Sequence, residues 1–116
     1  MQSFRGLKSL ILGENKISDT GIRIITDYLT SINKLQLNTN TFTANALANI
    51  ANLKELKVLD IRNNNLGDES LKHLSTLSLL QELSVSKNGI TDKGLPYLCT
   101  LTNLSYLDFT TNLITD

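Results

Sequence analysis

The sequence predicts an α/β solenoid in which short parallel strands and short helices alternate along a single stack of repeats. The first observation is a column of asparagines at intervals of 25, 24, 24 and 24 residues, namely Asn15, Asn40, Asn64, Asn88 and Asn112. The second is that the spacing of apolar residues changes from two to between three and four inside every repeat. Because one such unit cannot bury its apolar side alone, we expect the units to stack around a common core.

The first half of each repeat predicts a strand and a turn. The segments at residues 7–17, 32–42, 56–66, 80–90 and 104–114 read LKSLILGENKI, INKLQLNTNTF, LKVLDIRNNNL, LQELSVSKNGI and LSYLDFTTNLI. Each has apolar residues at segment positions 1, 4, 6 and 11 and asparagine at position 9. The alternation over positions 3 to 7 is the period of a strand with one buried face. Strands that recur in this way are expected to pair in parallel along the stack.

The second half of each repeat predicts a short helix with one buried stripe. Apolar residues recur at Ile22 and Ile25, Leu47 and Ile50, Leu71 and Leu74, and Leu95 and Leu98, each pair followed by Leu29, Leu53, Leu77 or Leu101. Residues 1–116 are therefore expected to form one domain of about four and a half repeats. Met1 and Phe4 fit the tail of a preceding repeat, and Asp116 falls where a fifth helix would start. We therefore expect the chain to be a window of a longer array.

The pattern LxxLxLxxNxL resembles the signature of leucine-rich repeats, matched five times with Ile, Val or Phe in some leucine positions. The resemblance covers essentially the whole chain. The second halves, such as ITDKGLPYLCTL and LGDESLKHLSTL, are similar to the helical repeats of F-box-associated and bacterial effector-like proteins. They lack the Gly-x-Ile-Pro element of the plant receptor type. The resemblance implies a right-handed superhelix with strands on the concave face, helices on the convex face, and a protein-binding role.

The asparagine column lies where the chain leaves the strand, and we expect it to form a structural ladder. An inward amide offers two donors and one acceptor for backbone groups of its own turn and of the next repeat. Leaving such a buried group unpaired costs about 1–3 kcal/mol. We therefore expect Asn64→Ala to destabilise the fold far more than Asn63→Ala or Asn65→Ala. In this interpretation Asn63 lies on the rim of the strand face and Asn65 is an ordinary turn residue.

Acidic residues recur where the helices are expected to start. Asp19, Asp68, Asp92 and Asp116 are expected to cap the helices by accepting hydrogen bonds from the first free amides. An acidic metal stripe is the alternative, but capping needs only the single carboxylate per turn that the sequence supplies. Small residues follow two positions later, at Gly21, Ala46, Ser70 and Gly94, and predict close packing of helix on strand.

Two residue types that often carry chemistry occur once each, Cys99 and His73. Cys99 follows Leu95 by four residues, which predicts a buried structural thiol. His73 is expected on the outward side of the helices, pointing away from the direction of Cys99, so no Cys–His dyad is predicted. The sequence has no phosphate loop, nucleophile elbow or metal-ligand cluster, so no catalytic residue, metal or cofactor is predicted.

The outward residues of the strands form the candidate partner-binding surface. These are Lys34, Gln36, Val58, Asp60, Arg62, Glu82, Tyr106 and Asp108. Tyr106 beside Asp108, with Asp60, Arg62 and Glu82 nearby, is the most specific patch, because tyrosine and arginine are common at interface hot spots. The alternative is that these are merely solvated strand residues.

Composition argues against several classes of partner. Lys plus Arg equals Asp plus Glu at 11 each, which gives no electrostatic reason to expect nucleic acid or an anionic membrane. No apolar run is long enough to span a bilayer. A single cysteine excludes an intrachain disulfide, so we expect a reducing, cytoplasmic location, or the host cytosol for a secreted bacterial effector.

The function predicted from the sequence is a non-catalytic scaffold that binds a protein partner on its concave strand face. Two alternatives remain open. The chain is a recognition segment of a larger enzyme such as a ligase, or it is a structural module that self-associates through its uncapped ends.

Overall fold

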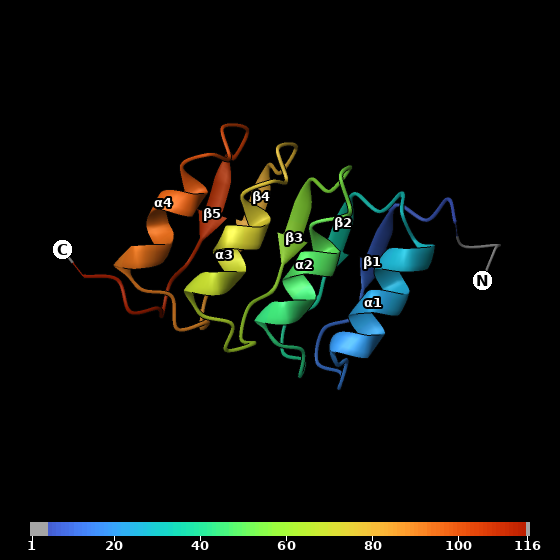
Figure 1. Cartoon of the computed structure of the whole chain (residues 1–116), viewed down its shortest axis with the longest axis horizontal. Helices are drawn as coiled ribbons and strands as arrows, with labels where there is room; N and C mark the ends of the chain where they lie inside the picture. Colours follow the sequence, from blue (N-terminus) through green and yellow to red (C-terminus); the bar gives the residue numbers. More distant parts are fainter. Residues whose placement is uncertain (1–4, 116) are drawn as a thin grey trace.

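The computed structural model describes residues 5–115, which form one layer of strands and one layer of helices (Figure 1). The strands are β1 (Ser9–Ile11), β2 (Lys34–Gln36), β3 (Val58–Asp60), β4 (Glu82–Ser84) and β5 (Tyr106–Asp108). The helices are α1 (Asp19–Tyr28), α2 (Leu47–Ile50), α3 (Asp68–Leu74) and α4 (Leu95–Leu98). Short 3₁₀ turns, η2 (Ala44–Ala46) and η3 (Asp92–Gly94), lead into α2 and α4.

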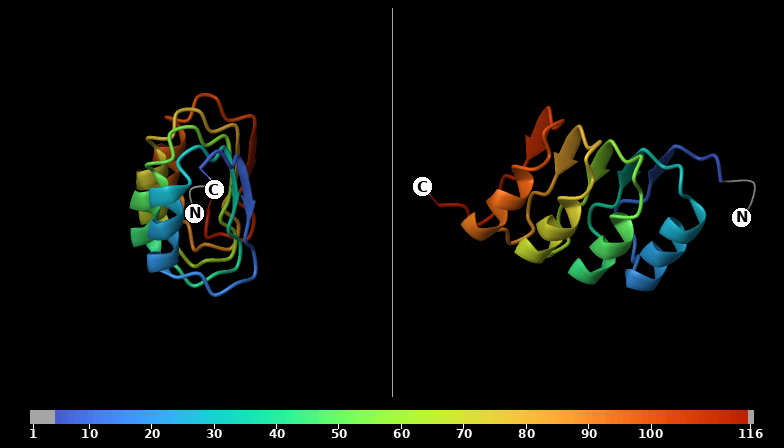
Figure 2. Two further views of the ribbon diagram at one scale, coloured as in Figure 1. Left: turned by 90° about the vertical axis from the view of Figure 1, so that its right-hand side faces the viewer. Right: turned by 45° about the horizontal axis from the view of Figure 1, so that its top comes forward.

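The strands form one parallel sheet in the order β1-β2-β3-β4-β5. Their register aligns equal segment positions, so that Val58 pairs with Lys34 on one side and with Glu82 on the other. The helices lie side by side against one face of this sheet, and the other face carries no helix among the described residues (Figure 2). The predicted leucine-rich-repeat solenoid is therefore confirmed.

The core runs along the stack between the two layers. In the three middle repeats the inward strand positions 4 and 6 are almost completely buried, at Leu35, Leu37, Leu59, Ile61, Leu83 and Val85. The same positions in the last described repeat are more open, and Leu107 is 38% exposed. Burial therefore depends on a neighbouring repeat on each side, as expected of a solenoid in which each unit contacts only its neighbours.

Each turn after a strand uses a left-handed backbone residue at segment position 8. The φ angles are 59° at Glu14, 58° at Thr39, 58° at Asn63, 56° at Lys87 and 56° at Thr111. This conformation is uncommon outside glycine and rare for a β-branched residue. It is held by hydrogen bonds between repeats, such as the Thr39 N–H donating to the Arg62 carbonyl at 2.9 Å.

Asn65 also has a positive φ, of 55°, and so the expectation that it is an ordinary turn residue is wrong. Its equivalent in the next repeat is Gly89, with a φ of 69°. Asparagine tolerates this region better than most residues. Two of the three consecutive asparagines, Asn63 and Asn65, thus have backbone roles.

The small residues near the helix starts are closely packed, but the nearest neighbours of Gly94 lie on the adjacent helix α3 and not, as had been predicted, on a strand. Ala46 and Ser70 are completely buried. A Cβ added to Gly94 would lie 2.6 Å from Oδ1 of Asp68 and 2.9 Å from Cδ1 of Leu71. Pro96 lies in the first turn of α4, where its missing N–H leaves no intrahelical bond unmade.

The aspartates at the helix starts do not cap their own helices, so that expectation is wrong. Asp19 and Asp68 are the first residues of α1 and α3, and neither helix has a side-chain cap bond. Asp92 begins η3, where the capping acceptor is the Thr91 hydroxyl instead. An aspartate that is already part of the helix places its carboxylate beside the next repeat. It does not precede the free N–H groups of its own first helical turn, as a capping residue does. Asp116 lies outside the described residues, as do Met1 and Phe4.

Each of these carboxylates instead joins two neighbouring repeats through a threonine. Asp19 accepts from the N–H and hydroxyl of Thr43 at 2.6 and 2.7 Å. Asp68 accepts from the same groups of Thr91 at 2.8 and 2.6 Å. Asp92 accepts from the N–H of Thr115 at 2.9 Å and from its hydroxyl. The stack therefore has a second line of bonds between repeats.

Cys99 is exposed, and the prediction of a buried thiol is wrong. Its equivalents Ala51 and Ser75 are half-buried, because each has a further repeat beside it. Cys99 follows α4, the last described helix, and its thiol donates weakly to the Leu95 carbonyl at 3.8 Å. Among residues 5–115, no further helix lies beside α4 to cover Cys99.

Candidate functional site

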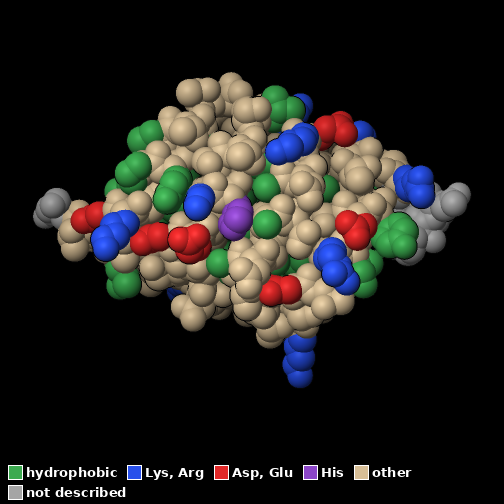
Figure 3. Space-filling view, in the orientation of Figure 1, with side chains coloured by type: hydrophobic (Ala, Val, Ile, Leu, Met, Phe, Trp, Pro, Cys, Tyr) green, Lys and Arg blue, Asp and Glu red, His purple; other side chains and the backbone are tan. Residues whose placement is uncertain are grey.

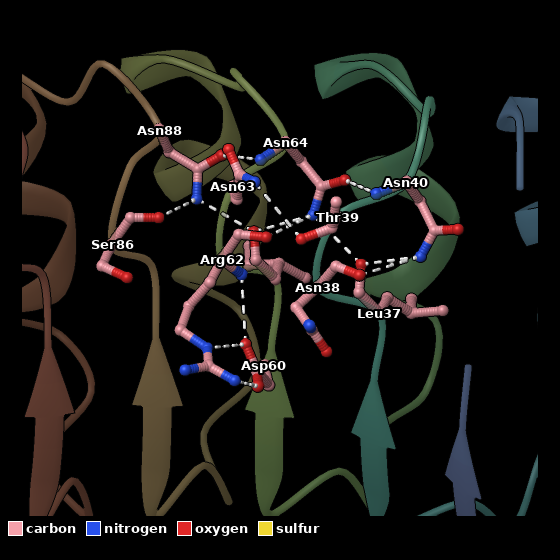
Figure 4. A network of polar contacts seen from close by, with 11 residues as sticks. Leu37, Asn38, Thr39, Asn40, Asp60, Arg62, Asn63, Asn64, Ser86 and Asn88 are labelled. Carbon is pink, nitrogen blue, oxygen red and sulfur yellow. Dashed lines mark hydrogen bonds and ion pairs between the residues drawn. The ribbon is translucent and has the colours of Figure 1, made fainter. Parts of the chain in front are cut away.

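The asparagine column lines the turns above the strands and joins successive repeats (Figure 4). The Asn64 amide donates to the Leu37 carbonyl of the preceding repeat at 3.1 Å and to the Ile61 and Arg62 carbonyls of its own repeat at 2.9 and 3.1 Å. Its oxygen accepts from the Asn40 N–H at 2.8 Å. These bonds hold the backbone that carries the outward side chains of the strands.

The same pattern recurs in neighbouring repeats, with one difference at the first. The Asn88 and Asn112 oxygens each accept two backbone N–H groups of the preceding repeat, at 2.9–3.2 Å. Asn15 is exposed, and its amide donates only to the nearby Leu12 and Gly13 carbonyls. The ladder is therefore weakest at the first described repeat.

The outward side of the sheet, called here the strand face, places the predicted residues in two rows. One row follows the paired positions Lys34, Val58, Glu82 and Tyr106. The other follows Gln36, Asp60, Ser84 and Asp108. Tyr106 is 52% exposed and Ile11, at the other end of the sheet, is 64% exposed. Within a row, paired residues are about 4.8 Å apart from strand to strand, and the two rows are neighbours because their members lie two residues apart on the same face of each strand.

Asp60 is not an open contact residue, because Arg62 covers it. The Arg62 guanidinium donates to both carboxylate oxygens of Asp60, at 2.8 Å from Nε and 2.7 Å from Nη2. The Asp60 side chain is only 8% exposed, whereas that of Arg62 is 45% exposed. The hydrogen bond to Asp60 raises the pKa of Arg62 above its usual value, with a further contribution from the Asp60 charge. Such a forked pair fixes the arginine in one orientation.

A polar pocket of about 180 Å³ lies at the edge where the strands pass into their turns. Asn38, Thr39, Arg62, Asn63, Ser86 and Lys87 line it, and we call it the turn-edge pocket. Arg62 is among the candidate partner contacts predicted from the sequence, and Asn63 was expected at the rim of the same face. Thr39, Asn63 and Lys87 share segment position 8, which the sequence pattern could have indicated as a column beside the asparagine ladder.

The helix side of the molecule carries acidic, basic and hydrophobic side chains that are intermixed (Figure 3). His73 is half-buried in α3, and Tyr97 in α4 is 37% exposed. Within residues 5–115, no three or more His, Cys, Asp or Glu side chains come together in a way that could hold a metal ion. None of the described helices is long and apolar enough to cross a membrane.

An apolar hollow of about 460 Å³ lies at the last described repeat. Leucines of α4, of β5 and of the segment between them line it, together with Cys99 and Phe109. The leucines that line it are equivalent to core residues that are buried in the middle repeats, where a neighbouring repeat covers them. It is a separate surface from the strand face.

Comparisons with known proteins agree with this architecture. A leucine-rich-repeat family model matches residues 7–23, 53–75 and 76–99, which is more than half of the chain. The internalin InlF of Listeria monocytogenes superposes with a TM-score of 0.82 at 31% identity, over 95% of this chain and 30% of InlF. Internalin C2 of the same bacterium gives 0.71 at 24% identity, over 97% of this chain and 56% of its own.

A plant peptide hormone receptor, RGFR1, solved in complex with RGF2, gives a TM-score of 0.61 at 21% identity, over 96% of this chain and 17% of the receptor. The chain thus spans less than two thirds of each of these proteins. A comparison with curated proteins gave no match. The repeat match, the parallel sheet and the ladder of asparagines agree with one another, and the chain belongs to the leucine-rich-repeat family.

Proposed function

We propose that the chain is a protein-interaction module that binds a partner through its strand face. The observation that carries this proposal is the contrast between a regular frame and a varied surface. The buried positions repeat from unit to unit, whereas the paired outward positions change from Lys34 to Val58, Glu82 and Tyr106. A surface that varies on a fixed scaffold is suited to recognise one shape and charge pattern.

The strand face also has features that binding requires. Tyr106 is exposed and lies next to Glu82 in the register, which places an aromatic anchor beside an acceptor. Tyrosine contributes large contact area at a low cost in side-chain entropy. Arg62 is held by Asp60 and so loses little freedom on binding. The plant peptide hormone receptor with the same fold was solved in complex with RGF2, which supports a peptide or protein as the class of partner.

The test compares two double variants that remove the same residue types from opposite layers. Glu82→Ala with Tyr106→Ala changes the strand face, and Glu69→Ala with Tyr97→Ala changes the helix face. All four side chains are exposed, so both variants are expected to fold. Partners are captured with the wild-type chain, identified by mass spectrometry, and their affinities are measured with purified proteins.

We expect the strand-face variant to weaken binding at least about tenfold, equivalent to about 1.4 kcal/mol, and the helix-face variant to change it little. Equal affinity of the strand-face variant and the wild type would contradict the proposal. Circular dichroism of each variant shows whether a loss of binding reflects a loss of folding.

The apolar hollow at the last described repeat favours a second candidate, self-association. Leu107, which lines this hollow, is 38% exposed. A second copy of the chain would bury such side chains, whose transfer from water stabilises by about 25 cal/mol per Å². Sedimentation velocity at several concentrations tests this: a single species of monomer mass at every concentration would remove the candidate.

A further inference from the structure

We propose that the turn-edge pocket binds a carboxylate of the partner, that is, the side chain of a glutamate or aspartate. This inference rests on the proposed function, and it names the chemistry that one part of the strand face recognises. The pocket lies between three successive repeats, because its lining residues come from the second, third and fourth turns. A pocket of about 180 Å³ suits a single side chain that projects from a partner, rather than a flat stretch of its surface.

The pocket offers hydrogen-bond donors that the fold itself does not use. The Arg62 guanidinium donates to Asp60 through Nε and Nη2, which leaves Nη1 without a protein acceptor among residues 5–115. The Ser86 hydroxyl and the Lys87 ammonium likewise have no acceptor in the described part of the chain, although both line the pocket. Three donors of this kind around one hollow favour a ligand that only accepts hydrogen bonds.

The arginine is already positioned for such a ligand. Asp60 fixes the guanidinium plane by a forked pair, and the Asp60 side chain is itself 8% exposed. Arg62 therefore does not have to be ordered when a ligand binds, which reduces the entropic cost. Planar guanidinium groups match carboxylates in geometry as well as in charge.

The balance of charge favours a carboxylate over a phosphate group. Arg62 and Lys87 supply two positive charges at the pocket, and the Asp60 carboxylate compensates one of them. The negative charge of Asp108 also acts on Arg62. The Oδ1 atom of Asp108 accepts hydrogen bonds from the N–H and the hydroxyl of Thr110. The remaining positive charge suits a ligand with one negative charge. A phosphorylated side chain carries about −1.5 to −2 charges at pH 7.

The experiment titrates the ¹⁵N-labelled chain with three capped tripeptides that differ in one side chain. Acetyl-Gly-Glu-Gly-amide carries the carboxylate, acetyl-Gly-Gln-Gly-amide is its uncharged match, and acetyl-Gly-phosphoserine-Gly-amide carries a phosphate. We expect only the glutamate peptide to shift the backbone amide signals of Arg62, Asn63 and Lys87 in a saturable way at low salt. Raising the salt concentration should weaken this binding, because the pocket is open to solvent.

One variant removes the pocket's free cation without straining the turn. Lys87→Asn introduces the residue that Asn63 supplies at the same segment position in the preceding repeat, and asparagine accepts the left-handed backbone. Lys72→Gln, on α3 in the helix layer, removes the same charge elsewhere and serves as the matched control. We expect Lys87→Asn to weaken binding of the glutamate peptide about tenfold and Lys72→Gln to leave it unchanged.

Three results would overturn the inference: equal shifts with the glutamine peptide, tighter binding of the phosphoserine peptide, or unchanged glutamate binding in Lys87→Asn. These results are separable from a failure of the proposed function. Partner binding that depends on Glu82 and Tyr106 but survives Lys87→Asn overturns the carboxylate pocket alone. Glutamate binding that depends on Lys87 supports the pocket even where the Glu82 and Tyr106 variant leaves partner affinity unchanged, a result that overturns the proposed function alone.

Discussion

Replacing Asn64 with alanine removes a middle rung of the asparagine ladder. The Asn64 amide donates to the carbonyls of Leu37, Ile61 and Arg62, and its oxygen accepts from the Asn40 N–H. Alanine can make none of these bonds. Asn64 is a buried residue, so water does not readily replace the missing side chain. We therefore expect a large loss in the free energy of unfolding.

The magnitude follows from which backbone groups keep a partner after the substitution. The Leu37 and Ile61 carbonyls still accept from the side-chain amides of the neighbouring rungs, and the Arg62 carbonyl still accepts from the Thr39 N–H. The Asn40 N–H loses the acceptor that the structure gives it. One orphaned donor costs about 1–3 kcal/mol, and the lost shared bonds add about 1 kcal/mol. We expect a loss of about 3 kcal/mol, and a melting temperature lower by about 10 °C.

Urea and thermal unfolding followed by circular dichroism measure this loss. Asn15→Ala is the matched control, because Asn15 is exposed and donates only within its own turn, so its loss should stay below about 1 kcal/mol. Asn63→Gly and Asn65→Gly keep the positive φ and should be close to neutral, whereas alanine at either position adds backbone strain of about 1 kcal/mol. Glycine thus gives a cleaner comparison than alanine at the two flanking positions.

Two results would refute this reasoning. Equal destabilisation by Asn15→Ala and Asn64→Ala would show that the bonds between repeats contribute nothing. Asn64→Asp keeps an acceptor but turns a second oxygen toward three carbonyl oxygens, so it should destabilise at least as much as alanine. A neutral Asn64→Asp would show that the donors of the amide do not matter.

Three further predictions concern packing, backbone strain and pH. Gly94→Ala places a methyl group against Oδ1 of Asp68 and should lower the free energy of unfolding by about 2 kcal/mol in urea titrations; an unchanged midpoint would contradict this. Thr39→Asn relieves a β-branched residue at a φ of 58° and should raise stability by about 1 kcal/mol, so a lower melting temperature would count against it. The hydroxyl and the N–H of Thr115 donate hydrogen bonds to Asp92 and lower its pKa below 3.8. The contribution of these bonds to the stability of the fold is therefore present above that pH, and it is lost as the pH falls through the folded-state pKa of Asp92. Thr115→Val should raise the Asp92 pKa in an NMR titration, and an unchanged value would rule out the hydroxyl as its main cause.

The sequence predicted the frame well because the frame is periodic and local. The alternation of apolar residues assigns Leu59 and Ile61 to the core, and both are almost completely buried. The small residue at Gly94 was expected to pack closely, and it leaves no room for a Cβ. These features depend on one repeat and its immediate neighbour, and every neighbour has nearly the same sequence pattern.

The errors occurred where a side chain had several partners within reach. Asp68 was expected to bind amides of its own helix, but the close stacking of repeats brings Thr91 within 2.8 Å of it. Asp60 was expected to face a partner, but Arg62, two residues on and on the same side of the strand, folds over it. Spacing alone does not show which of these competing hydrogen bonds forms.

The amino-acid sequence by itself determined the repeat length, the strand and helix halves, the buried columns and the asparagine ladder. Each of these follows from side-chain periodicity, which the fold translates directly into inside and outside. Only the tertiary structure decided which carboxylates join neighbouring repeats, which turn residues adopt a left-handed backbone, and how Arg62 and Lys87 come to border one pocket. These features depend on the distance and rotation between stacked units, which are set by the packing of all the repeats together.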